Sequence, residues 1–125
     1  MGHLTVGDAE SVDAAERARD LMATIGARAR TKNLQRVTDL EEGLRAAATG
    51  TCSDDSRLAL VDVAHQLVGS AGTFGFARVS AGARELELML TETSFADPEK
   101  LTAAAARLEG LRQDLLGEPD EETDD

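Results

Sequence analysis

Apolar residues recur three and four positions apart along most of the chain, and this spacing constrains the fold more than any other feature. It keeps apolar side chains on one face of an α-helix, whereas a half-buried strand alternates at every second residue. Aromatic residues make up only 2% of the sequence, with no Trp or Tyr, while Ala, Leu, Glu and Arg, which favour helix, are abundant. The sequence therefore predicts an all-α protein.

Five helical segments follow from these stripes and from the residues that begin and end helices. The first spans about residues 9–30 and the second about 34–49, and the stripes are equally compatible with a second segment that continues the first. A third starts after the loop at 51–55 and runs through His65 to about Gly72 or Thr73; a fourth follows the corner at 72–75, and Asp97-Pro98 starts a fifth. The residues expected to face the core outside the third helix are Val12, Ala15, Ala18, Met22, Ile25, Leu34, Val37, Leu40, Leu44, Ala47, Val79, Ala83, Leu86, Leu90, Leu101, Ala104, Leu108, Leu111 and Leu115.

A chain of 125 residues is long enough for one domain with a buried core and too short for two. Short loops between the helices predict an antiparallel up-and-down four-helix bundle with an additional N-terminal helix. We expect residues 1–8 to be a flexible N-terminus and residues 9–116 to form the bundle. Residues 117–125, GEPDEETDD, hold six acidic groups and are predicted to be a disordered tail.

The net charge of the chain excludes some classes of binding partner, and its cysteine content indicates the cellular compartment. A net charge of −11 argues against nucleic acid and anionic membranes as partners, because both need clustered Lys and Arg. The sequence shows neither a signal peptide nor a segment long enough to span a membrane. Its single cysteine, Cys52, excludes an internal disulfide and a cysteine-rich metal site. A cytoplasmic location is the expectation.

One histidine, His65, lies within the apolar pattern of the third helix. On a helical wheel the core candidates Leu60, Val63, Leu67 and Phe74 lie almost opposite it, so the imidazole is predicted to point away from the core. A glycine inside a helix costs about 1 kcal/mol against alanine, and Gly69, one turn along, would clear space beside the ring. The residues expected to share the outward face with His65 are Leu58, Val61, Asp62, Val68, Gly69 and Gly72. An apolar rim around an accessible nucleophile suits a site that a partner covers during reaction.

These residues carry a resemblance to a known family. The segment from His65 to Phe76, HQLVGSAGTFGF, with the apolar residues after it and Glu87, resembles the signature of histidine-containing phosphotransfer (HPt) domains. Its GTFGF part is similar to the phosphotransfer module at the start of chemotaxis histidine kinases. The motif covers residues 64–87, about a quarter of the chain. The apolar residues that follow the segment are Val79, Ala83 and Leu86.

The resemblance implies a helical bundle in which His65 carries a phosphoryl group. The group would pass between a histidine kinase or its receiver domain and the aspartate of a response-regulator receiver domain. Gly69 would give clearance, with Gln66, Val68 and Gly72 shaping the site; the family usually has Lys or Arg where this chain has Val68. A neutral imidazole nitrogen is a suitable nucleophile, and its phosphoramidate stays reactive enough to pass the group on.

The sequence contains neither a P-loop nor a kinase signature, so we expect a phosphoryl carrier that is not itself an enzyme. We expect no cofactor and no bound metal, because the partner would supply the metal ion. The alternative is a docking adaptor that binds receivers or kinases without being phosphorylated, and a metal–carboxylate enzyme is disfavoured because no Glu-x-x-His pair occurs. The residues expected to contact a partner are Arg57, Leu58, Val61, Asp62 and Val68.

Overall fold

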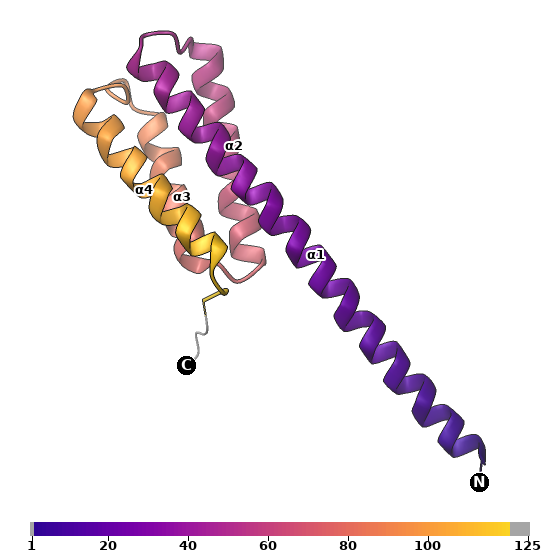
Figure 1. Ribbon diagram of the computed structural model, residues 1–125. Helices are drawn as coiled ribbons and strands as arrows, with labels where there is room; N and C mark the ends of the chain where they lie inside the picture. Colours follow the sequence, from indigo (N-terminus) through magenta and orange to yellow (C-terminus); the bar gives the residue numbers. More distant parts are fainter. Residues whose placement is uncertain (1, 121–125) are drawn as a thin grey trace.

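In the computed structural model, four α-helices pack side by side, each antiparallel to the next along the chain (Figure 1). The structure describes residues 2–120, with side chains from residue 12 onwards. The helices are α1 (Gly2–Ala48), α2 (Asp54–Thr73), α3 (Ala77–Leu90) and α4 (Pro98–Leu116). Contacts join α1 to α2, α2 to α3, α3 to α4 and α4 to α1, so the four helices form a closed ring around one core. The all-α bundle is thus as predicted.

The expected additional N-terminal helix is wrong, because α1 continues without a break through both of the first two predicted segments. The predicted junction at residues 31–33 holds neither proline nor glycine, and its polar side chains bond within the helix. Thr31 Oγ1 donates to the Ala27 carbonyl, and the buried Asn33 accepts from Arg36 Nη1 at 2.8 Å. At 1.5 Å per residue the 47 residues of α1 extend about 70 Å.

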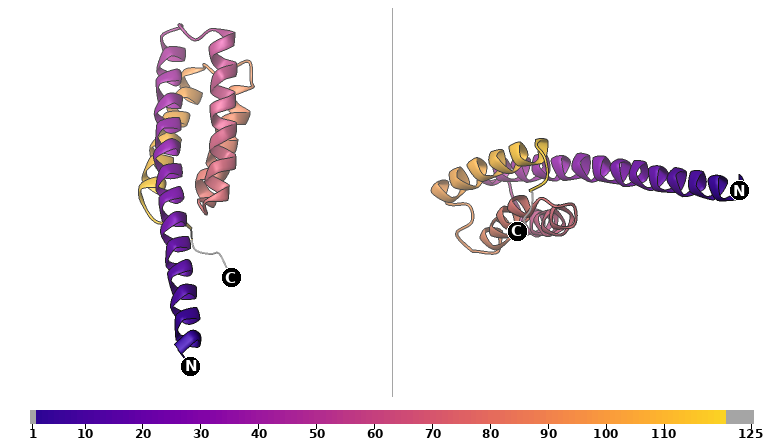
Figure 2. Two further views of the ribbon diagram at one scale, coloured as in Figure 1. Left: turned by 90° about the vertical axis from the view of Figure 1, so that its right-hand side faces the viewer. Right: turned by 90° about the horizontal axis from the view of Figure 1, so that it is seen from below.

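The N-terminal half of α1 projects beyond the other three helices (Figures 1 and 2). Its apolar stripe was predicted to face the core, and this is wrong: Val12, Met22 and Ile25 are exposed, as is the neighbouring Leu21. The reason is geometric, since α2 and α4 are less than half as long as α1 and do not reach this part of it. A periodic stripe shows that a helix has an apolar face but not which element covers that face.

The stripes of the other helices lie in the core as predicted. The set expected on α3 and α4 is buried throughout, and on α1 burial begins at Asn33 and continues through Val37 and Leu40 to Ala47. Leu67, Leu108 and Leu115 are fully enclosed. The bundle core therefore lies between residue 33 and the end of α4, as the spacing of apolar residues indicates.

The hairpin of α2 and α3 is held by specific caps at its two ends. Ser53 precedes α2 and its Oγ accepts from Ser56 N at 3.1 Å, with two aspartates in the first turn. At the other end Gly75 adopts φ +88°, a left-handed conformation that favours glycine. Phe76 N then donates to the Ala71 carbonyl at 2.8 Å, which closes the end of α2 and turns the chain into α3.

The start of the predicted acidic tail is tied to this hairpin. Helix α3 follows Phe76 and has no capping side chain of its own; Asp120 Oδ2 accepts from Arg78 N in its first turn at 2.8 Å. The backbone N–H of Asp120 donates to the Gly75 carbonyl, and Arg30 of α1 donates to the Gly117 carbonyl. Ordered contacts thus extend to residue 120. Residues 121–125 lie outside the described part, and flexibility of residues 1–8 stays a prediction.

Candidate functional site

His65 lies at the middle of α2 on the side that faces α3, and its side chain is 68% exposed. Its Nδ1 is 3.0 Å from Oε2 of Glu87 on α3. An ionised carboxylate can only accept a hydrogen bond, so this contact requires the proton on Nδ1. The lone pair of the neutral ring is then on Nε2, the nitrogen that the contact with Glu87 leaves unused. The exposed imidazole predicted from the helical wheel is confirmed.

Two glycines predicted to shape the site have different surroundings. A Cβ at Gly69, one turn after His65, would meet no atom within 4 Å. A Cβ at Gly72 would lie 3.4 Å from Oγ of Ser80 on α3, and that hydroxyl donates to the Val68 carbonyl at 2.8 Å. Gly72 therefore allows α3 to approach α2 closely, whereas nothing within the protein demands a glycine at Gly69.

Val68 was placed on the outward face in the sequence analysis, and this is wrong. Its side chain is only 8% exposed and belongs to the core cluster, next to Leu67. The reason is that α3 packs along this side of α2, so the covered face of α2 is wider than the stripe opposite His65 and also includes Ala64 and Ala71. Val68 is not available to a partner in this structure, and its contribution to the site is packing beneath it.

The remaining predicted contact residues divide into exposed and internally bonded ones. Leu58 is an exposed apolar side chain and Val61 is half-buried against the core. Asp62 and Gln66 are both exposed, and the Asp62 carboxylate accepts a hydrogen bond from Gln66 Nε2 at 2.8 Å. Arg57 instead donates to the Leu90 carbonyl at 2.9 Å and lies over a phenylalanine ring, which ties α2 to the end of α3.

Glu87 contacts the imidazole of His65, although no role was predicted for it beyond its place in the motif. A signal for it was present in the sequence. His65 and Glu87 are both 11 positions from Phe76, at the corner of the hairpin. In an antiparallel pair of helices, residues equally far from the turn lie side by side, so an acid at this position meets the histidine. Leu88, the next residue, is also exposed.

The same register brings a basic residue to the site. On α3, Ser80 bonds to the Val68 carbonyl and Glu87 bonds to His65. Arg84 follows Ser80 by four positions and precedes Glu87 by three, so the three residues share one face of α3. It is exposed, and it takes part in none of the ion pairs found among the described residues. The register sets Arg84 of α3 at the level of Val68, the position at which the resembled family usually has Lys or Arg.

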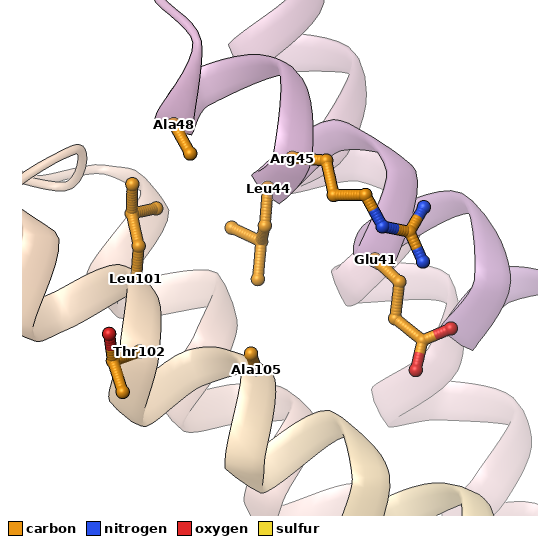
Figure 3. Close-up of a pocket in the computed structure, with 7 residues that line it drawn as sticks. All are labelled: Glu41, Leu44, Arg45, Ala48, Leu101, Thr102 and Ala105. Carbon is orange, nitrogen blue, oxygen red and sulfur yellow. The ribbon is translucent and has the colours of Figure 1, made fainter.

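A separate pocket of about 320 Å³ opens between α1 and α4 (Figure 3). Its lining includes the Glu41 and Arg45 side chains and apolar residues such as Leu44 and Leu101, but no residue of α2 or α3. It therefore shares no residue with the His65 site. In the described part of the chain, no three His, Cys, Asp or Glu side chains are grouped to hold a metal ion.

Comparison with protein-family models matches the chain to the Hpt domain over residues 13–118. The match covers most of the chain, including the whole His65–Glu87 hairpin. The chain belongs to the Hpt domain family. No curated protein and no solved structure gave a significant match. The resemblance drawn from the motif of residues 64–87 is thereby confirmed.

Membership in the Hpt family implies a role in histidine phosphotransfer within a phosphorelay. An Hpt domain is a phosphocarrier, and these 125 residues match it without an accompanying kinase domain. Hpt domains typically interact with receiver domains. Between residues 2 and 120, no helix is both long and apolar enough to span a bilayer.

Proposed function

We propose that this Hpt protein accepts a phosphoryl group on Nε2 of His65 and exchanges it with an aspartate of a response-regulator receiver domain. The observation that carries the proposal is the exposed imidazole whose Nδ1 is held by Glu87 at 3.0 Å. It fixes the ring orientation and the tautomer and leaves one nucleophilic nitrogen open to solvent. A histidine kinase is the proposed source of phosphoryl groups, and the cytoplasm the proposed location.

Acceptance of the group is a displacement at phosphorus. The Nε2 lone pair attacks a donor phosphate, for example a receiver's aspartyl phosphate, so that an N–P bond forms while the P–O bond to the aspartate breaks. The departing carboxylate keeps the electron pair of that bond. The imidazole ring becomes positively charged because its Nδ1 proton stays in place, and the Glu87 carboxylate, only 20% exposed, stabilises that charge.

Donation reverses these events. A receiver carboxylate attacks the phosphorus, the N–P bond breaks, and its electron pair returns to Nε2 of His65. The transferred group carries negative charge on three oxygens, so a nearby cation favours both directions. Arg84 is the proposed source of that cation, because the position normally basic in the family is here the buried Val68. Gly69, with open space at its Cβ position, lets the partner's acidic pocket approach the ring.

The direct test is transfer of label from phosphorylated kinase or receiver domains of the same organism. We expect an acid-labile, base-stable label on the wild-type chain and none on His65→Gln. Because His65 is exposed, the variant should keep the thermal melt of the wild type, which serves as the check on folding. Label that persists on His65→Gln would place the phosphoryl group elsewhere. Receiver binding with no label on either protein would instead identify a docking adaptor.

The role of Arg84 has its own test. Arg84→Gln should lower the transfer rate about tenfold, the loss expected for one charge-assisted hydrogen bond, without changing stability. Arg45→Gln is the matched control, since Arg45 is an exposed arginine on the far side of the bundle, at the α1–α4 pocket. Equal rates for the two variants would remove Arg84 from the site and leave the assignment of His65 untouched.

A further inference from the structure

Two helical stretches beside His65 carry basic and no acidic residues, although the chain as a whole is strongly acidic. The sequence has 24 acidic and 13 basic residues. Residues 21–38 of α1, together with residues 63–84, which run from α2 into α3, hold six basic residues and no acidic one. His65 lies in the second stretch, and the first belongs to a helix packed against α2. The acidic residues of the chain therefore lie outside these two segments.

Three of these cations form a row along α1. Arg28, Lys32 and Arg36 follow one another at every fourth residue, so they share one side of the helix, and we call them the basic row. Arg28 and Lys32 are exposed and Arg36 is half-buried. None of the three takes part in an ion pair within residues 12–120, where the structure describes side chains. Arg30 differs, because it donates to the Gly117 carbonyl at the end of α4.

The register of α1 against α2 places the basic row beside the phosphorylation site. Arg36 Nε donates to Gln66 Oε1 at 3.4 Å, and Gln66 is the residue next to His65. Further along the same pair of helices, a Cβ at Gly43 would overlap the Leu60 side chain. In an antiparallel pair, these two contacts set residues 37 and 38 of α1 level with His65.

A partner that covers His65 would also cover the basic row. A specific interface takes up about 800 Å² on each partner, which corresponds to a disc of about 16 Å radius. At about 1.5 Å per residue, Lys32 lies about 8 Å and Arg28 about 14 Å along α1 from the level of His65. Met22, in the exposed apolar part of α1, lies about 23 Å from that level and falls outside the disc. The interface therefore includes the cations of α1 and excludes its apolar end.

We propose that the basic row docks an acidic surface of the receiver domain that exchanges the phosphoryl group with His65. The residue of the receiver that exchanges this group is an aspartate in an acidic pocket, so the surface that faces His65 has the charge complementary to the row. Exposed cations beside a docking site act mainly on the rate of association, because they attract the partner before contact. The inference rests on the proposed function, because it takes a receiver domain as the partner.

The test is the rate at which the chain associates with an unphosphorylated receiver domain that binds it, measured by stopped-flow fluorescence at about 20 and 500 mM salt. The double variant Arg28→Gln/Lys32→Gln should associate about tenfold more slowly at the lower salt concentration and at the wild-type rate at the higher one. Arg17→Gln/Arg19→Gln is the matched control, because it removes the same charge from exposed positions of α1. These positions lie about 28–31 Å from the level of His65, so the control should associate at nearly the wild-type rate.

Equal rates for the wild type and the row variant would overturn the proposal. The same loss in the control variant would also overturn it, because net charge alone would then explain the effect. Faster association of the row variant would assign the row to an acidic segment of the chain itself, again against the proposal. Each of these outcomes leaves the label on His65 intact, whereas failure of the proposed function removes that label and still allows receiver binding to test the row.

Discussion

Replacement of Gly69 by alanine is expected to change the stability of the protein and the rate of phosphotransfer in opposite directions. The residue lies inside α2, one turn after His65, and its carbonyl accepts from Thr73 Oγ1 at 2.9 Å. An added methyl group would meet no atom within 4 Å. Within the isolated protein the glycine therefore offers no packing advantage, and it carries the backbone entropy cost of any helical glycine.

Gly69→Ala should accordingly raise the free energy of unfolding by about 1 kcal/mol. For a domain of this size that gain corresponds to an increase of about 3–5 °C in Tm. Phosphotransfer should change in the opposite direction. The methyl group would occupy the space beside the imidazole through which a receiver must approach Nε2, so we expect kcat/KM for transfer to fall about tenfold or more.

The assay pairs thermal unfolding with the rate of label transfer to a receiver. Gly110→Ala is the control, because Gly110 is also an exposed glycine inside a helix, α4, with no atom within 4 Å of an added Cβ. The Gly110→Ala variant should be stabilised to a similar extent, and its rate of phosphoryl transfer should be unchanged. Gly69→Ala that is more stable and still transfers at the wild-type rate would refute the reasoning that this glycine provides clearance for a partner.

Three further predictions follow from single contacts. Glu87→Gln should slow transfer about tenfold at unchanged stability, because an amide does not stabilise the charged phosphohistidine ring, and stopped-flow transfer kinetics test this. Asp120→Ala should lower the free energy of unfolding by about 1 kcal/mol through loss of the cap at Arg78 N, as read by urea denaturation. Val68→Lys should cost about 1–3 kcal/mol in the same denaturation experiment, because its position is nearly buried.

The helices and most of the core could be predicted because each depends on local information. The spacing of Val79, Ala83, Leu86 and Leu90 identifies a buried face without knowledge of its neighbours, and Pro98 marks the start of a helix by itself. The exposure of the His65 imidazole could be predicted for the same reason, because the helical wheel of a single helix places it opposite the core side chains.

Apart from the break expected in α1, which is continuous, the errors concern which element covers a face. Val68 was expected on the surface, but α3 packs over it; the stripe at Met22 was expected inside, but α2 and α4 do not extend that far along α1. Arg57 is bonded to the Leu90 carbonyl of a helix more than 30 positions away. No local pattern contains this information, because it depends on the relative lengths of helices and on their order around the bundle.

The sequence by itself thus determined that the chain is a helical Hpt protein with one histidine facing outward, since periodicity and a motif are properties of neighbouring residues. Tertiary structure decided what surrounds that histidine. Only the pairing of α2 with α3 brings Glu87 to Nδ1 of His65. The sequence identifies histidine as the nucleophile, but the tautomer of its ring and the charges around it depend on side chains from distant parts of the chain.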